Sequence, residues 1–132
     1  MKNIFKNNYP KVNITKCELD QSSYQYDNMK WDAPTLIAFC KRKNYPTFDM
    51  PLACVDLQRC PFILDNFSDF LYHAQRTNNT DLKYPVLLDN DGIICDGWHR
   101  VAKAILEGKT SIKAIRMEEM PKVSGYTNKK ED

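Results

Sequence analysis

The stretch YPVLLDNDGIICDGWHRVAKAILEGKTSIKAIRM, residues 84–117, has the most regular pattern in the chain. It begins with two apolar runs on either side of an Asp-Gly turn, which is typical of a β-hairpin. Val101, Ala104 and Ile105 then recur at helical spacing, and Gly108 supplies a stop. The alternating segment 110–117 predicts a further strand. This order of elements predicts an α+β domain with a mixed sheet packed against helices.

Two helices and two strands are predicted upstream of this stretch. The first strand has the least regular pattern. Residues 31–45 have a candidate N-cap at Asp32, a proline in the first turn and basic residues in the last, which predicts a helix. The apolar segment 52–57 predicts a buried strand. A second helix is predicted at 65–79, with one apolar face made of Phe67, Phe70, Leu71 and Ala74. A loose alternation over residues 11–19 predicts a first strand.

Length and composition indicate a single domain. The chain has 132 residues, of which 42% are hydrophobic, which is enough for one core. We expect the domain at residues 11–120, between a flexible arm at 1–10 and a polar, disordered tail at 121–132. No apolar run has the length of a membrane span, and the first residues lack the apolar stretch of a secretory signal. A cytoplasmic protein with no membrane partner is therefore expected.

Charge and cysteine content argue against several function classes. The net charge of +2 is small for a domain specialised in duplex binding, although Lys41, Arg42 and Lys43 form a local basic cluster. The 5 cysteines are an odd number without C-x-x-C spacing. Neither a disulfide framework nor a zinc knuckle is indicated, and reduced thiols are expected.

The start of the predicted helix at residue 98 concentrates the residues best suited to chemistry. A helix N-terminus offers unpaired N–H groups and partial positive charge, which together favour a bound phosphate. Gly97 has no Cβ and would let an anion approach the backbone closely. Arg100 adds a permanently charged fork, and His99 adds a hydrogen-bond donor that can transfer protons near neutral pH. The pattern therefore predicts an anion site.

Two residues of this segment have a plainer interpretation that stays open. Asp96 could be the N-cap of an ordinary helix, which would stabilise it by about 1 kcal/mol. A capping carboxylate would occupy the place of the phosphate, so the two interpretations compete. Trp98 could be a core aromatic, or a surface on which a nucleotide base stacks.

The whole stretch 84–117 resembles the core of the ParB/sulfiredoxin-like superfamily, in which an apolar strand, a second strand, a Gly-x-His/Arg-Arg turn, a helix and a strand follow in this order. Members of that superfamily hold ATP, CTP or ADP phosphates at this turn. The resemblance implies that Gly97, His99 and Arg100 occupy phosphate-binding positions. It also implies that Asp96 lies close to a transferring phosphoryl group, as in the kinase members.

The sequence departs from the superfamily in two respects. Sulfiredoxin has its reactive cysteine immediately before the His-Arg pair, where this chain has Trp98, and Cys95 is not the matching position. Sulfinic acid reduction is therefore not expected. The chain also has no room for the helix-turn-helix and dimerisation domains of a chromosome-partitioning ParB, so centromere binding is not expected.

Phosphoryl transfer would need a base or a metal ligand close to the phosphates. Asp96 is the first candidate, both as a catalytic residue and as a ligand of Mg²⁺ bound with ATP, ADP or CTP, and His99 is a second catalytic candidate. Asp56, at the end of the predicted strand 52–57, could supply another carboxylate, as could Glu18 or Asp20.

The predicted second helix adds two further candidates. His73 and Arg76 are three residues apart and so lie on one side of that helix. If the helix lines the cleft, they form a second anion-binding pair. If it does not, they are ordinary surface residues.

Three functions follow as hypotheses. The first is a nucleotide- or phosphate-binding ParB-like protein, acting as a small phosphotransferase or nucleotide hydrolase. The second is a nucleic-acid-associated protein, a weak nuclease or a regulator that uses the basic cluster. The third is an interaction or inhibitor protein with a vestigial pocket, in which Tyr24, Tyr26 and Trp31 form a protein-binding patch rather than packing on the core.

Overall fold

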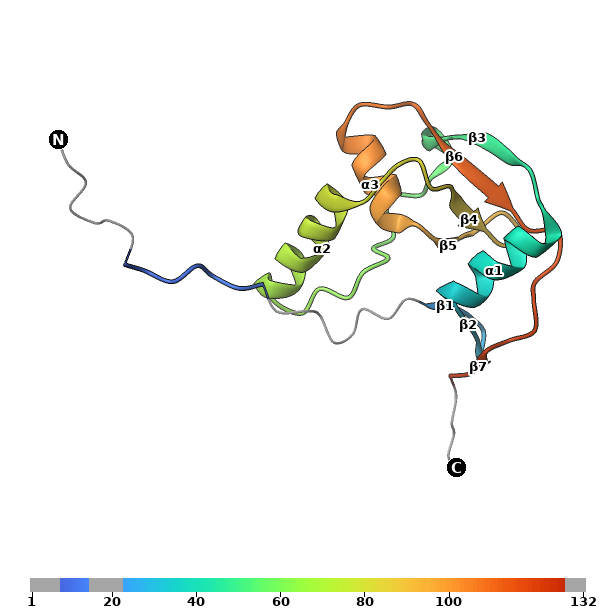
Figure 1. Ribbon diagram of the computed structural model, residues 1–132, viewed down its shortest axis with the longest axis horizontal. Helices are drawn as coiled ribbons and strands as arrows, with labels where there is room; N and C mark the ends of the chain where they lie inside the picture. Colours follow the sequence, from blue (N-terminus) through green and yellow to red (C-terminus); the bar gives the residue numbers. More distant parts are fainter. Residues whose placement is uncertain (1–7, 15–22, 128–132) are drawn as a thin grey trace.

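The computed structural model describes residues 8–14 and 23–127, which form three α-helices and two β-sheets (Figure 1). The helices are α1 (Ala33–Lys43), α2 (Phe67–Asn79) and α3 (Trp98–Leu106). A short 3-10 helix, η1, spans Leu52–Cys54. The predicted α+β class is confirmed. No helix in this described part of the chain combines the length and apolar character needed to cross a membrane.

The main sheet has four strands in the order β3, β6, β4, β5. Their bounds are Thr47–Pro51, Ser111–Arg116, Val86–Leu88 and Ile94–Asp96 respectively. Strand β6 runs parallel to β4 and antiparallel to β3, so the sheet is mixed. Strands β4 and β5 form the predicted hairpin, and α3 and β6 follow as predicted, so the expectation for residues 84–117 is confirmed element by element.

Both faces of the main sheet are buried. On one face, Val101 and Ala104 of α3 pack with a cluster of strand side chains that includes Val86, Leu88 and Ile112. Leu87 points to the opposite face, because successive strand residues alternate, and there it packs with Leu36 and other residues of α1. The sheet therefore fixes α3 relative to the ends of β4 and β5, where the candidate site lies.

Asp89 shapes the turn between β4 and β5. One of its carboxylate oxygens accepts hydrogen bonds from the backbone N–H groups of Asp91 and Ile93, both at 2.9 Å. The other accepts the hydroxyl of Tyr24 at 2.6 Å. Burial, together with this bond to Asp89, raises the pKa of Tyr24 above its usual range. The acidic turn is thus used internally and holds β1 against the hairpin.

The second sheet is small and has the order β1 (Ser23–Tyr26), β2 (Met29–Asp32), β7 (Gly125–Tyr126). Trp31 is buried, stacks with Tyr24 at 5.8 Å between ring centroids, and donates its indole N–H to the Pro121 carbonyl at 2.8 Å. Tyr26 is 52% exposed. Two of the three aromatic residues considered as a protein-binding patch therefore pack together within the fold.

The segment 121–132, which we expected to be a polar tail, contributes β7 to this small sheet. Besides the bond to Trp31, the Ser124 N–H donates to the Lys30 carbonyl at 2.8 Å. Residues 125–126 therefore belong to the second sheet, the residues just before them are hydrogen-bonded to β2, and 128–132 lie outside the described residues.

The predicted strand at 52–57 was wrong. The strand lies earlier, at β3, and Leu52 begins η1 instead. Only Met50 is buried in β3, whose remaining residues are exposed because the strand is at the edge of the sheet. An edge strand with so little apolar alternation has no clear sequence pattern.

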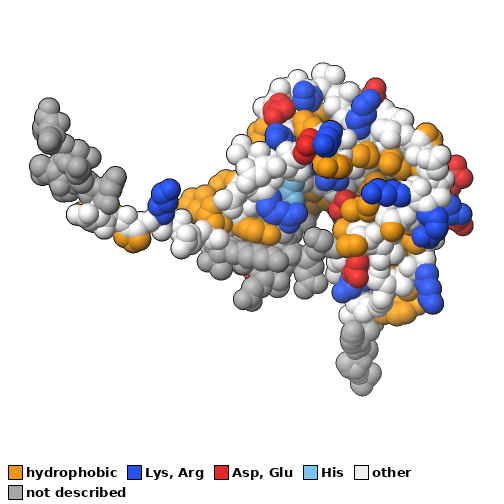
Figure 2. All heavy atoms as spheres, viewed as in Figure 1, with side chains coloured by type: hydrophobic (Ala, Val, Ile, Leu, Met, Phe, Trp, Pro, Cys, Tyr) orange, Lys and Arg blue, Asp and Glu red, His pale blue; other side chains and the backbone are white. Residues whose placement is uncertain are grey.

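The predicted apolar face of α2 was also wrong, although the helix itself is confirmed. Phe67 is 71% exposed and Phe70 is 51% exposed, and their rings stack on one another. Figure 2 shows hydrophobic side chains at the surface near the N-terminal end of α2. The buried positions are polar, namely Asp69, His73 and Thr77.

Part of the predicted first strand at 11–19 can be compared with the structure. Residues 11–14 are not in a strand, and the remainder, with the candidate carboxylates Glu18 and Asp20, lies outside the described residues. In the predicted arm at 1–10, only residues 8–10 are described.

Candidate functional site

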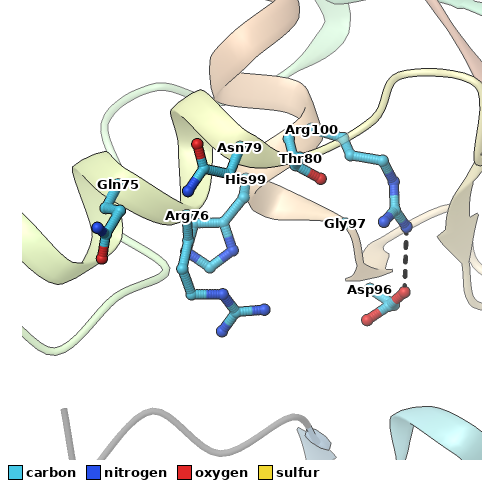
Figure 3. A pocket seen from close by; sticks show the side chains of 8 residues that line it. All are labelled: Gln75, Arg76, Asn79, Thr80, Asp96, Gly97, His99 and Arg100. Carbon is cyan, nitrogen blue, oxygen red and sulfur yellow. Dashed lines mark hydrogen bonds and ion pairs between the residues drawn. The ribbon is translucent and has the colours of Figure 1, made fainter. Parts of the chain in front are cut away.

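A pocket of about 310 Å³ opens at the N-terminus of α3 (Figure 3). Its walls come from the last turns of α2 and from the end of β5 with the first turn of α3. Its described lining residues are Gln75, Arg76, Asn79, Thr80, Asp96, Gly97, His99 and Arg100. The structure therefore brings Arg76 of the second helix to the predicted anion-binding segment.

Gly97 is required by the protein's own packing. Its φ of +109° is a conformation that residues with a side chain rarely adopt. A Cβ there would also lie 2.9 Å from Arg100 Nη2 and 3.1 Å from Val86 Cγ2. The missing side chain thus accommodates Arg100 and Val86, and the approach of an anion to the Gly97 backbone stays a prediction.

Asp96 is not the N-cap of α3. Gly97 occupies that position, and no side chain makes a capping hydrogen bond to the helix. Asp96 Oδ2 instead accepts from Arg100 Nη2 at 3.2 Å, one helical turn ahead, and both side chains are partly exposed. The capping interpretation was therefore wrong, and Asp96 orients the guanidinium.

Arg100 is held in place by more than this ion pair. Its Nη2 also donates to the Pro85 carbonyl at 3.1 Å. Its Nε is buried and has no hydrogen-bond partner among the described residues. A guanidinium with five donors is fixed here by one nitrogen, so donor capacity is left for a ligand.

His73 and His99 form a hydrogen-bonded pair between α2 and α3. His73 Nδ1 lies 2.9 Å from His99 Nε2, so one ring nitrogen donates and the other accepts. Phe62 stacks on both imidazoles, with centroid distances of 4.2 Å to His73 and 4.5 Å to His99 and an angle of 13° in each case. His73 is 4% exposed. Of the two alternatives for His73, the surface position is therefore excluded, and His73 is also not among the described lining residues of the pocket. Its hydrogen bond orients His99.

Lys103 joins the C-terminal end of α2 to α3. Its ammonium donates to the carbonyls of Asn78, at 3.3 Å, and Thr80, at 2.7 Å. These carbonyls lie at the end of α2, where a cation also interacts favourably with the helix dipole. The lysine thus fixes the end of α2 that carries Arg76, Asn79 and Thr80 into the pocket.

Four of the residues just described were not predicted from sequence as part of the site. Gln75, Asn79 and Thr80 line the pocket because α2 packs against α3, and no local pattern marks that contact. Phe62 lies in a loop and covers the histidine pair. The spacing of His73 and Arg76 on one side of α2 was the available signal that this helix faces the site.

Two predicted site residues lie elsewhere. Trp98 packs against the apolar cluster beneath α3 and is not among the described lining residues of the pocket, which favours its interpretation as a core aromatic. Asp56 is exposed beyond η1, where its carboxylate accepts the Gln58 N–H at 2.9 Å. It therefore stabilises a turn and does not join Asp96.

The basic cluster and the cysteines also have structural roles or lie outside the pocket. Lys41, Arg42 and Lys43 fill the last turn of α1, and Lys43 pairs with Glu119 at 2.8 Å. Cys95 is buried, and burial raises the pKa of its thiol well above the usual range. A buried thiol of this kind is a poor nucleophile.

The charges of the pocket favour an anion. Two arginines face one carboxylate among its described lining residues, and the N–H groups of the first turn of α3 add partial positive charge. The described residues contain no group of three or more His, Cys, Asp or Glu side chains that could hold a metal ion. Binding of Mg²⁺ by Asp96 together with a nucleotide stays a prediction.

Comparison of the sequence with protein-family models finds no match, and comparisons with curated proteins and with solved structures likewise find none. The likeness to the ParB/sulfiredoxin-like superfamily therefore stays a prediction that rests on residues 84–117.

Proposed function

We propose that the pocket at the start of α3 binds a phosphate group, and that the ligand is a nucleotide. The observation that supports this function is the convergence of Arg76 and Arg100, from two different helices, on one pocket at a helix N-terminus. Arginine presents a planar fork that matches phosphate oxygens, and a helix N-terminus stabilises the same charge. Figure 2 shows a histidine side chain among basic side chains on this face.

His99 and Asp96 have distinct parts in this proposal. His99, oriented by His73, is the group able to donate a hydrogen bond or a proton to the bound phosphate. Asp96 competes with the phosphate for Arg100, because both are anions that bind the same guanidinium. Phosphotransferase or hydrolase chemistry in this pocket would use these two side chains.

A thermal melt in the presence of phosphate compounds tests the binding. ATP, ADP, CTP, GTP and tripolyphosphate are added separately, with and without Mg²⁺. A ligand at a hundred times its dissociation constant is expected to stabilise the wild-type protein by about 2.7 kcal/mol, a shift of several degrees. Arg76→Ala and Arg100→Lys should reduce the shift. Arg59→Ala, which removes an exposed arginine outside the described pocket lining, should leave it unchanged.

Two outcomes of the melt would contradict the proposal. No shift with any compound in the wild-type protein, or an equal shift in Arg76→Ala and wild type, would overturn it. Asp96→Asn then separates the roles of that carboxylate: binding of tripolyphosphate should strengthen because a competing anion is removed, and measured release of inorganic phosphate should fall if Asp96 is catalytic.

A further inference from the structure

A second pocket of about 440 Å³ adjoins the proposed phosphate pocket. Asp96 and Arg100 line both. The ion pair between them therefore separates the two pockets. The first pocket is lined on its other side by polar side chains of α2, and the second pocket is lined by mostly apolar residues. The second pocket is called the apolar groove below. Its lining residues other than this pair are Ile37, Cys40, Lys41, Asn44, Tyr45, Tyr84, Pro85, Leu87 and Ile115.

The apolar groove has the composition of a site for a planar group. Tyr45 packs against Phe39 with ring centroids 6.1 Å apart, so its position is fixed from behind. Tyr84 is 55% exposed, and the Lys83 ammonium lies 5.2 Å from its ring centroid. Ile37, at 42% exposure, is an apolar α1 residue left out of the core. Aromatic rings with aliphatic neighbours are the usual surroundings of a stacked base.

The distribution of groups between the two pockets suits a nucleotide. Arg76 lines only the first pocket, Asp96 and Arg100 line both, and Tyr45 and Tyr84 line only the apolar groove. In a nucleotide, a hydroxylated sugar likewise lies between the phosphates and the base. A carboxylate has about four acceptor sites, and Arg100 uses one oxygen of Asp96. Asp96 can therefore accept hydrogen bonds from sugar hydroxyls while its ion pair is kept.

We propose that the two pockets are halves of one nucleotide site, with the phosphates at Arg76 and Arg100 and the base in the apolar groove against Tyr45 and Tyr84. This inference rests on the proposed phosphate binding and adds the location of the nucleoside. It also explains the exposure of Tyr84 and Ile37, which a ligand would cover. Each pocket alone is in the lower half of the usual size range of ligand sites, and the two together form an elongated one.

Isothermal titration of tripolyphosphate and of ATP, CTP and GTP tests the inference. The nucleotides are expected to bind the wild-type protein more tightly than tripolyphosphate does. Tyr84→Ala should weaken the preferred nucleotide by about 5- to 150-fold, which is the loss seen when one stacked aromatic side chain is removed, and should leave tripolyphosphate unchanged. Tyr84→Phe keeps the ring and should retain wild-type affinity.

Tyr126→Ala is the matched control, because Tyr126 is 63% exposed and lies on β7 in the other sheet. It should affect neither ligand. If tripolyphosphate binds as tightly as every nucleotide, or if Tyr84→Ala weakens both equally, the base does not lie in the groove and the inference fails while phosphate binding stands. If tripolyphosphate and the nucleotides all fail to bind, the proposed function itself fails.

Discussion

Helices α1 and α2 are of similar length but bury opposite kinds of surface. α1 turns an apolar face to the main sheet, made of Ala33, Leu36, Phe39 and Cys40. α2 buries polar side chains and exposes Phe67 and Phe70. A helix packed through apolar side chains gains stability in proportion to the area removed from water. A helix packed through polar side chains gains little stability, because the hydrogen bonds inside the protein only replace those that the same groups made to water.

The difference indicates that α1 serves stability and α2 serves the site. The buried polar groups of α2 are used to fix geometry: Asp69 accepts the Asp65 N–H at 2.9 Å, and His73 orients His99. The same helix carries Arg76, Asn79 and Thr80 into the pocket. Such a division can be tested by matched substitutions on the two sides of the molecule.

The largest effect is expected at Leu36, which is 0% exposed on α1. Leu36→Ala should lower the free energy of unfolding by about 2–5 kcal/mol, because it leaves a cavity in the core. Phe70→Ala on α2 removes a larger side chain but should lower the free energy of unfolding by less than Leu36→Ala does, since Phe70 is 51% exposed. Urea denaturation measures both. Similar losses for the two variants would contradict the comparison.

A smaller effect is expected at the start of α3. Gly97→Ala introduces strain at a positive φ and a Cβ too close to Arg100 and Val86, and should destabilise by about 1–3 kcal/mol. Gly92→Ala is the control, because Gly92 also has a positive φ, of +86°, but nothing lies within 4 Å of its added Cβ. Denaturation measures the free energy of unfolding of both variants, and the larger loss at Gly97 is due to the close packing of Arg100 and Val86. Equal losses at the two glycines would show that this packing does not restrict residue 97.

The histidine pair is expected to show a measurable coupling. In a double-mutant cycle, His73→Ala and His99→Ala should be non-additive in the free energy of unfolding by about 0.5–3 kcal/mol, since the residues are in contact. A parallel cycle of His73→Ala with Tyr126→Ala should be additive within about 0.5 kcal/mol, because Tyr126 belongs to the other sheet. Additivity in both cycles would show that the pair does not hold α2 against α3.

The last effect is one of reactivity. Cys40 of α1 and Cys95 are buried, and burial raises the pKa of both thiols, whereas Cys54 and Cys60 are exposed. The thiolate is the reactive form, so brief alkylation at neutral pH should label peptides containing Cys54 and Cys60 and spare those containing Cys40 and Cys95. Mass spectrometry reads the labels. Rapid labelling of Cys40 would mean that α1 does not stay packed on the sheet.

Much of the fold could be predicted from sequence where local pattern and tertiary environment agree. Residues 84–117 carry apolar runs, an Asp-Gly turn and a stop at Gly108, and their elements occur in the predicted order. β3 was misplaced because a strand at a sheet edge, with Met50 as its one buried residue, lacks a hydrophobic period. The face of α2 was misjudged because its partner, His99, lies 26 residues away and no local rule refers to it.

The same distinction between local pattern and tertiary packing applies to the candidate site. The residues from the end of β5 to the first turn of α3 were predicted together because they are close in sequence, and the structure places Asp96, Gly97, His99 and Arg100 in one pocket. Their interactions were not predictable in detail, since Asp96 pairs with Arg100 instead of capping the helix. The α2 contribution and Phe62 depend on packing between distant segments, which a single sequence does not encode locally.

The small sheet joins the beginning and the end of the described domain, so it can form fully only late in synthesis. Strand β2 pairs with β1, its immediate neighbour in sequence, and with β7, about a hundred residues later. A nascent chain that has emerged as far as Met117 already holds every strand of the main sheet, but its Trp31 indole still lacks the Pro121 carbonyl. The second sheet and the hydrogen bond of Trp31 can therefore be complete only after residues 121–126 have been synthesised, later than every strand of the main sheet.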